Sequence, residues 1–165
     1  MQQRLHPAAR TSARLLLTLP LPPSINEQYA EVGGHRVSPE VARRFKREVR
    51  RHVERLEREG ALSEQVIECF RRCYLALYLQ FYFSTPLKRD LDGGLKITID
   101  ALVCASLGAN DNRVVDIHLS KFIAPNHERL EVEQEAIEDW QFDEEDVLLV
   151  PRKAAGGIET ARTTD

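Results

Sequence analysis

The chain has 165 residues, of which 42% are hydrophobic and 30% are charged. This composition is typical of a globular protein, and the length predicts one domain with a substantial core rather than two domains. No apolar run reaches the roughly 18 residues that a membrane-spanning helix requires, and the N-terminal stretch lacks the apolar centre of a signal peptide. The odd number of cysteines, three, argues against a disulfide framework or a zinc site and predicts a reducing cytoplasm.

The net charge of −3 conceals an uneven distribution. Residues 36–58 carry nine Lys and Arg against four Glu, whereas residues 126–146 carry ten acidic residues against one arginine. A local excess of basic side chains is what phosphate binding requires. A charged helix with a solvated outer face would show the same excess, so charge alone leaves both interpretations open.

The first predicted element is a strand over residues 14–19, which is ended by a cluster of prolines. A loop follows over residues 24–37. Ser38-Pro39-Glu40 then predicts the start of a helix, with serine as the N-cap and proline at the first helical position. The helix is expected to run to about Arg58. Its apolar residues keep a helical spacing, so one side should face the core: Val41, Phe45, Val49, Val53 and Leu56.

The second half of the chain predicts one more helix and three more strands. Residues 72–83 form the clearest strand, which is aromatic-rich and almost continuously apolar and should therefore lie centrally in a sheet. A helix over about 95–107 is followed by strands over 113–123 and 128–136. This order predicts an α+β fold with a mixed β-sheet and helices packed on it.

The predicted domain covers residues 14–150. The remaining segments are expected to be peripheral: a flexible arm over 1–13, a short packing element over 141–150 and a disordered tail over 151–165.

One stretch near the middle of the chain carries the residues most suggestive of chemistry. Asp92, Lys96 and Asp100 recur at a spacing of four, so a helix here would put all three on one face. Asp90 stands just ahead of that face, and Asp111 follows in a polar turn. Carboxylates converging from separate elements form the oxygen-rich kind of site that Mg²⁺ prefers. A lysine beside them is well placed to meet a phosphate or a leaving oxygen, so this set predicts a nuclease-like site.

Each of these residues also has a purely structural interpretation. Asp90 and Asp92 could cap a helix, because carboxylates near a helix N-terminus are favoured by its dipole. Asp111 could form a turn between its two asparagine neighbours. Asp100 is either a partner of Lys96 or a hydrogen-bonding residue that holds the fold, and the second interpretation is favoured.

Several pieces of this sequence agree in order and distance with one known family. They are Leu21-Pro22-Pro23-Ser24-Ile25-Asn26, Asp90-Leu91-Asp92, Lys96, Asp100-Ala101-Leu102, and Asp111 ahead of Val114-Val115. Together they resemble the RusA family, the Holliday-junction resolvases of bacteria and their phages, from about Leu15 to Val132. The resemblance implies a homodimer with a Mg²⁺-dependent site in each subunit, which makes paired nicks across a four-way DNA junction.

Carried onto matching positions, the resemblance implies that Asp90, Asp92 and Asp111 are the metal-binding carboxylates and Lys96 is the catalytic lysine. Three features depart from the family pattern. Gly93 stands where the family usually has asparagine, Asn110 replaces the first of two paired acids, and the loop over 27–36 has two acids and one arginine. The residues expected to contact DNA are Asn26, Lys88, Arg89, Arg43, Arg47 and Arg50.

The predicted function is therefore that of a Mg²⁺-dependent endodeoxyribonuclease that resolves Holliday junctions in DNA recombination and repair. It would act in the cytoplasm of a bacterium or of a phage-infected host. Two alternatives stay open: a non-catalytic junction-binding protein on the same fold, and a Mg²⁺-dependent nuclease of other branched DNA. Convergence of the three acids within metal-ligating reach would distinguish the enzyme from the binding protein.

Overall fold

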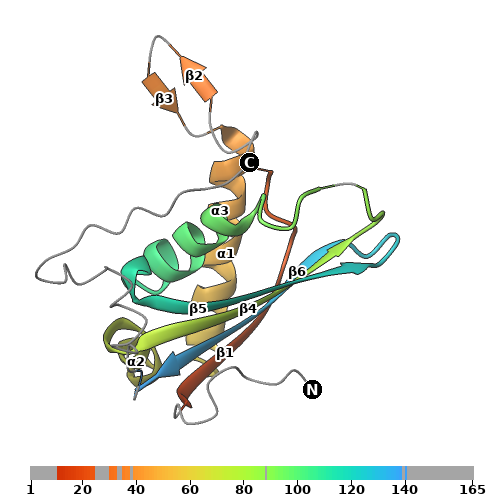
Figure 1. Cartoon of the computed structure of the whole chain (residues 1–165). Helices are drawn as coiled ribbons and strands as arrows, with labels where there is room; N and C mark the ends of the chain where they lie inside the picture. Colours follow the sequence, from red (N-terminus) through yellow and green to blue (C-terminus); the bar gives the residue numbers. More distant parts are fainter. Residues whose placement is uncertain are drawn as a thin grey trace, which may run out of the picture.

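The computed structural model describes residues 11–24, 30–32, 35–37, 39–87, 89–138 and 140, and this part is built on one four-stranded sheet (Figure 1). The strands are β1 (Thr11–Leu19), β4 (Tyr74–Phe83), β5 (Val114–Ile123) and β6 (Arg129–Ile137). Their order in the sheet is β1-β6-β4-β5, with β4 and β5 parallel and the other two pairs antiparallel. The mixed sheet with helices confirms the predicted α+β class.

Alternation along the strands separates the core from the open side of the sheet. In β1, Leu15, Leu17 and Leu19 are buried, whereas Leu16 between them is 63% exposed. This is the period of two expected for a strand with one covered face. Strand β4 lies between β5 and β6, so the prediction that the aromatic-rich strand is central is confirmed.

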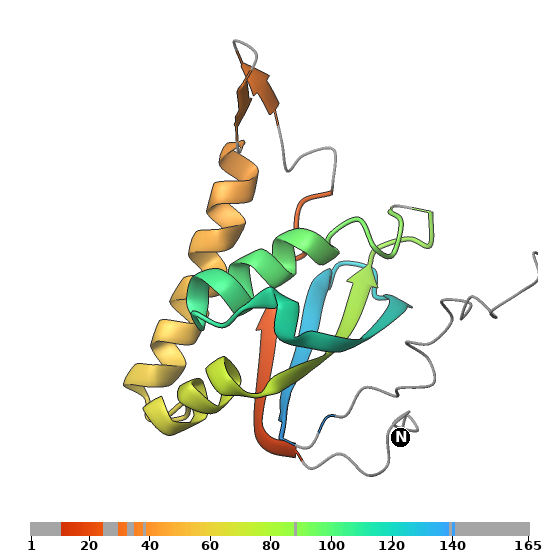
Figure 2. The same ribbon diagram turned by 60° about the vertical axis from the view of Figure 1, so that its left-hand side comes forward.

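The helices lie on one face of this sheet (Figure 2). They are α1 (Glu40–Arg58), α2 (Glu64–Arg72) and α3 (Leu95–Ile99), and α3 continues as the π-helix η2 (Asp100–Ser106). Helix α1 contacts η2 and β1, and its buried residues are Ala42, Phe45, Val49 and Val53. Of the residues predicted to face the core, Val41 is 46% exposed and Leu56 is half-buried, because the buried side is centred on Ala42 and Val49 and not on Val41. None of the described helices is both long and apolar enough to cross a lipid bilayer.

The start of α1 differs by one residue from the prediction. Pro39 is the N-cap and not the first helical residue, because its ψ of 159° is extended rather than helical. Glu40 therefore begins the helix, and Ser38, the predicted N-cap, lies outside the described residues. The end of the helix at Arg58 is as predicted.

Helix α2 was missing from the sequence-based prediction, which began the following strand at Arg72. Arg72 is instead the last residue of α2, and Cys73 is its C-cap. The sequence did contain a signal for this helix, because Ser63 is a residue type that commonly caps helix N-termini. In the structure, the Ser63 hydroxyl accepts a hydrogen bond from the Val66 backbone N–H at 3.3 Å and caps the helix. The predicted loop over 24–37 also contains a small hairpin, β2 (Ala30–Val32) with β3 (His35–Val37).

The predicted peripheral segments fall almost entirely outside the described residues. This applies to the arm over residues 1–10, the packing element over 141–150 and the tail over 151–165. Residues 11–13, which the prediction assigned to the arm, belong to β1.

Gln134 of β6 is a polar exception in the core. Its side chain is completely buried, in register with Leu15 of β1 and Leu77 of β4. Among the described residues, neither atom of its amide group has a hydrogen-bond partner. A buried polar group without a partner keeps the full cost of its desolvation.

Replacing Gln134 by leucine, which has a similar volume, should therefore raise the free energy of unfolding by about 1–3 kcal/mol. Urea denaturation of the two proteins measures this difference. The matched control is Gln80→Leu, because the Gln80 amide oxygen accepts a hydrogen bond from the Tyr82 hydroxyl at 3.1 Å. No gain, or a loss, in the Gln134→Leu protein would contradict the prediction.

Candidate active site

A cavity of about 440 Å³ lies where the α3–η2 segment meets the start of β5. Its polar lining includes three of the four predicted catalytic residues, together with Asp100. The complete lining is Asp92, Leu95, Lys96, Ile99, Asp100, Asp111, Asn112, Val114 and Ile117. The fold thus brings Asp92 and Lys96 to the same cavity as Asp111, which comes from a separate element.

Asp92 reaches this cavity from the turn ahead of α3. The helix begins only at Leu95, so Asp92 does not lie on a helical face with Lys96 as the spacing of four had suggested. The Leu95 backbone N–H donates to the Asp92 carbonyl oxygen at 2.9 Å and fixes this turn. Gly94 packs so tightly that an added Cβ would lie 2.3 Å from Cγ of Pro22. A glycine is therefore needed where the segment after β1 crosses the start of the helix.

Lys96 and Asp100 form an ion pair on the cavity wall. The Lys96 ammonium donates to Oδ1 of Asp100 at 3.1 Å, and the other carboxylate oxygen lies 3.9 Å from Nζ of Lys46. Of the two interpretations of Asp100, partnership with Lys96 is the one that the structure shows. Lys46 was not among the predicted site residues, because its distance from the motif in the sequence gave no signal of proximity.

Asp111 opens the short 3-10 turn η3 (Asp111–Arg113), directly before β5. The Asn110 side chain caps this turn by accepting from the Asn112 backbone N–H at 3.0 Å. Asp111 is therefore not needed as the turn's own cap. One carboxylate oxygen each from Asp111 and Asp100 and the sulfur of Cys104 all lie within 4.8 Å of one another.

Asp90 occupies a different position from the other predicted catalytic residues. It is exposed and borders a separate hollow, which is also lined by Pro22, Arg89 and Gly94. Its carbonyl oxygen accepts from the Gly93 backbone N–H at 3.4 Å. Asp90 is therefore not among the residues that line the cavity. Among the described residues, the acids whose ligating atoms come within 4.8 Å of one another are Asp100 and Asp111, together with Cys104, and not the predicted set of Asp90, Asp92 and Asp111.

The predicted DNA-contacting residues are held in different ways. Arg89 is half-buried and donates a hydrogen bond to the carbonyl oxygen of Pro22. Besides its predicted contact with DNA, it therefore links the turn ahead of α3 to the segment after β1. Arg43 and Arg47 both pair with Glu40, at 3.0 and 2.5 Å, and the hydrogen bond from Arg47 is the main cause that lowers the pKa of Glu40. Asn26 and Lys88 lie outside the described residues.

The basic residues of α1 nearest the cavity can be identified from helical spacing. Arg43 and Arg50 lie three residues before and four residues after Lys46, so all three share one side of the helix. Lys46 contacts Asp100 of the cavity, which places this side toward the site. Within the described part of the chain, Arg50 is exposed and forms no ion pair. A basic helix side thus adjoins the carboxylates.

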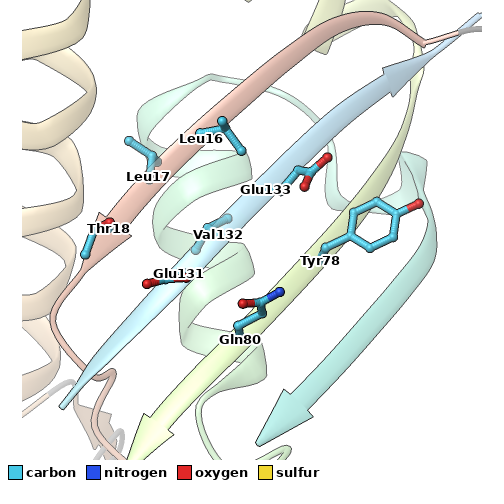
Figure 3. Close-up of a pocket in the computed structure, with 8 residues that line it drawn as sticks. All are labelled: Leu16, Leu17, Thr18, Tyr78, Gln80, Glu131, Val132 and Glu133. Atoms are coloured by element: carbon cyan, nitrogen blue, oxygen red, sulfur yellow. The ribbon is translucent and has the colours of Figure 1, made fainter. Parts of the chain in front are cut away.

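A second hollow, of about 290 Å³, lies on the sheet face that the described helices leave open (Figure 3). Tyr78 and Gln80 of β4 border it, together with Glu131 and Glu133 of β6. Its lining contains two carboxylates and neither lysine nor arginine, which disfavours an anionic ligand such as DNA. The cavity at Lys96 is therefore the better candidate for phosphate chemistry.

Carboxylates and a lysine at one cavity, with a basic helix alongside, are typical of a nuclease that acts on a phosphodiester backbone. The profile of the family described as Endodeoxyribonuclease RusA matches residues 20–135, which include the whole cavity lining. The chain belongs to the RusA family of endodeoxyribonucleases, and the predicted family is confirmed. Membership indicates an endodeoxyribonuclease of Holliday junctions. No curated protein matches the chain.

The pKa of the Cys104 thiol depends on the charged side chains around it. Burial raises the pKa of its thiol, and the Asp111 carboxylate raises it further, with a smaller contribution from Asp100. Because a thiol reacts as the thiolate, removing the charge of Asp111 should make Cys104 more reactive.

We expect Asp111→Asn to raise the iodoacetamide alkylation rate of Cys104 several-fold at mildly alkaline pH. The measurement uses mass spectrometry in a Cys69→Ser, Cys73→Ser background, so that a single thiol remains. Asp116→Asn is the control, because Asp116 pairs with His118 at 3.2 Å and is not part of the cavity lining. Equal rates for Asp111→Asn and the parent would show that the Asp111 carboxylate does not act on this thiol.

Proposed function

We propose that this protein is a Mg²⁺-dependent endodeoxyribonuclease that resolves four-way DNA junctions by paired symmetric nicks, in DNA recombination and repair. One observation carries the proposal: Asp92, Lys96 and Asp111 line a single cavity in a chain of the RusA family. We further propose that it acts in the cytoplasm of a bacterium or a phage-infected host, where such junctions arise.

The donor atoms at the cavity suit a hard divalent cation. Asp92 and Asp111 offer carboxylate oxygens from two elements at one cavity. Asp90, which borders a different hollow, is kept as the third proposed ligand because the family resemblance implies it. Mg²⁺ prefers oxygen ligands and takes sulfur poorly, so Cys104 is a neighbour of the site and not a proposed ligand. When bound, Mg²⁺ would supply a water of lowered pKa and neutralise charge on the phosphate.

Lys96 is the proposed partner of the scissile phosphate. Its side chain is 62% exposed at the cavity, and its ion pair with Asp100 limits the directions in which the ammonium group can point. A positive charge held there would stabilise the additional negative charge that develops on the phosphate and on the leaving oxygen. Asp100 is a positioning residue in this scheme, because it acts through Lys96.

Two nicks on opposed strands require two sites, and the described domain contains one such cavity. We therefore propose a homodimer, since a twofold axis is the simplest way to present two equal sites to a symmetric junction. Nucleases of other branched DNA share this chemistry. The distinction between them lies in which DNA is cut, so the wild-type protein is assayed in Mg²⁺ on a four-way junction, a flap and a linear duplex.

The carboxylate proposal is tested with Asp92→Asn and Asp111→Asn on a labelled four-way junction. Each change keeps the shape of the side chain and removes a strong metal ligand, so cleavage in Mg²⁺ should fall by orders of magnitude. Junction binding without Mg²⁺ should be equal or tighter, because like charges about 4 Å from a phosphate cost roughly 4 kcal/mol at an effective dielectric of 20. Asp90→Asn should behave in the same way if Asp90 is a ligand.

Lys96→Met should also abolish cleavage, but it should weaken binding because a positive charge beside the phosphate is lost. Asp116→Asn again serves as the control and should cut like the wild type. Near wild-type cleavage by both Asp92→Asn and Asp111→Asn would leave the carboxylates as structural residues. Tight binding of the junction without any cleavage by the wild type would favour the non-catalytic alternative.

A separate prediction concerns the basic side of α1. Replacing Arg43 and Arg50 by glutamine should weaken binding to junction and duplex alike, and should reduce the slope of log K against log salt by roughly 1 to 2, since each phosphate contact contributes about 0.9. Arg47 extends the same surface. The matched control is Arg44→Gln with Arg55→Gln, which removes two arginines from a different side of α1. Equal slopes in the two double variants would show that Arg43 and Arg50 do not contact phosphates.

A further inference from the structure

The loop over residues 107–113 carries Asp111 from η2 to β5 and has a defined conformation. Gly108 has a positive φ of 66°, which glycine adopts without strain. The Ala109 backbone N–H then donates to the carbonyl oxygen of Val103 at 2.9 Å and turns the chain back toward η2. Leu107 and Ala109 are buried in the core, so this first half of the loop is already packed against η2, whereas Asp111 beyond it is exposed.

Arg71 attaches the start of the loop to α2. Its Nε donates to the carbonyl oxygen of Leu107 at 3.0 Å. The guanidinium lies over Gly108, where an added Cβ would be 3.5 Å from Nε. Glu64 and Glu68 hold the guanidinium from its other side, at 3.1 and 3.6 Å from Nη1. The bond from Nε to the Leu107 carbonyl therefore joins the loop to α2, and the two ion pairs favour the side-chain conformation that makes this bond.

Arg113 makes a second attachment in the opposite direction. It stands at the end of η3, and its Nη1 donates to the carbonyl oxygen of Arg72 at 2.6 Å. Arg72 is the last residue of α2, where carbonyl groups lack partners within the helix and a positive charge is favourable. The two arginines therefore tie the loop to one helix end, on both sides of Asp111.

We infer that Arg71 and Arg113 are positioning residues that hold Asp111 at the metal site. The inference rests on the proposed function, in which Asp111 is a metal ligand. Asp90, Asp92 and Lys96 come from one continuous segment, whereas Asp111 arrives from across the cavity. Its distance from the other carboxylates therefore depends on where the loop is held. Replacing a residue that orients a metal ligand without binding the metal itself typically lowers metal affinity or activity by about 10- to 100-fold.

The test compares Arg71→Met with Arg72→Met. Arg72 is the matched control, because its side chain is 78% exposed and pairs with Glu68, while the acceptor for Arg113 is its backbone carbonyl. Arg71→Met should raise the Mg²⁺ concentration for half-maximal junction cleavage by about ten-fold, with a maximal rate close to wild type. Arg72→Met should leave it unchanged. Arg71→Lys, which keeps a donor for the Leu107 carbonyl, should recover part of the loss.

Mn²⁺ binding without DNA, followed by electron paramagnetic resonance, gives a readout that does not depend on cleavage. It should weaken about ten-fold in Arg71→Met and stay at the wild-type value in Arg72→Met. If Arg71→Met fails to fold, Arg113→Gln carries the same test with Arg71 in place. A purely structural role would lower the melting temperature and leave the metal dependence unchanged, and that result overturns the inference.

The failure of the proposed function would look different. If the wild-type protein neither binds Mn²⁺ nor cleaves DNA in Mg²⁺, the metal site itself is wrong, and the inference about Arg71 and Arg113 is overturned with it. If the wild type does both and Arg71→Met and Arg113→Gln match it, only the positioning role is wrong.

Discussion

The site depends on the burial of one side of η2. Ala101, Leu102 and Val103 are each at most 1% exposed, and η2 contacts α1. In a π-helix the hydrogen bonds run to the fifth residue back, and such turns occur often at functional sites. Rotating this segment would expose its apolar side to water at a cost of roughly 25 cal/mol per Å². Asp100 and Cys104 are therefore held toward Asp111.

Asp100 joins the basic helix to this site. Its two carboxylate oxygens face the ammonium groups of Lys96 at 3.1 Å and Lys46 at 3.9 Å. A carboxylate between two lysines reduces their mutual repulsion and lets both stay near one cavity. The same two positive charges are then available to a phosphate that enters beside them. The basic excess of α1 is thus placed at the cavity by Lys46, and Arg43 and Arg50 on the same side of the helix extend the positive surface along α1.

The elements that the sequence predicted well are those with a strong pattern of their own. Strand β1 ends at a cluster of prolines, α1 keeps a helical spacing of apolar residues, and β4 is long and apolar, so the type of each element can be read from its own sequence. The buried side of α1 was predicted only in part, because Val41 is exposed. Helix α2 was missed because it has only nine residues and the apolar start of β4 follows almost at once. The hairpin of β2 and β3 has strands of three residues, which are too short to show a period.

The sequence by itself determined the fold class and the family, and it predicted the residue types of the candidate site. Strand and helix periods and the spacing of Asp92, Lys96 and Asp111 are local properties that can be read along the chain. Only the tertiary structure decided that Lys46 meets Asp100 and that Arg71 reaches the loop beside Asp111. These contacts join residues far apart in the chain. The chain has many lysines and arginines of similar length. The packing of the helices on the sheet decides which of them forms each contact, because the sequence spacing of an exposed charged residue does not predict its partner.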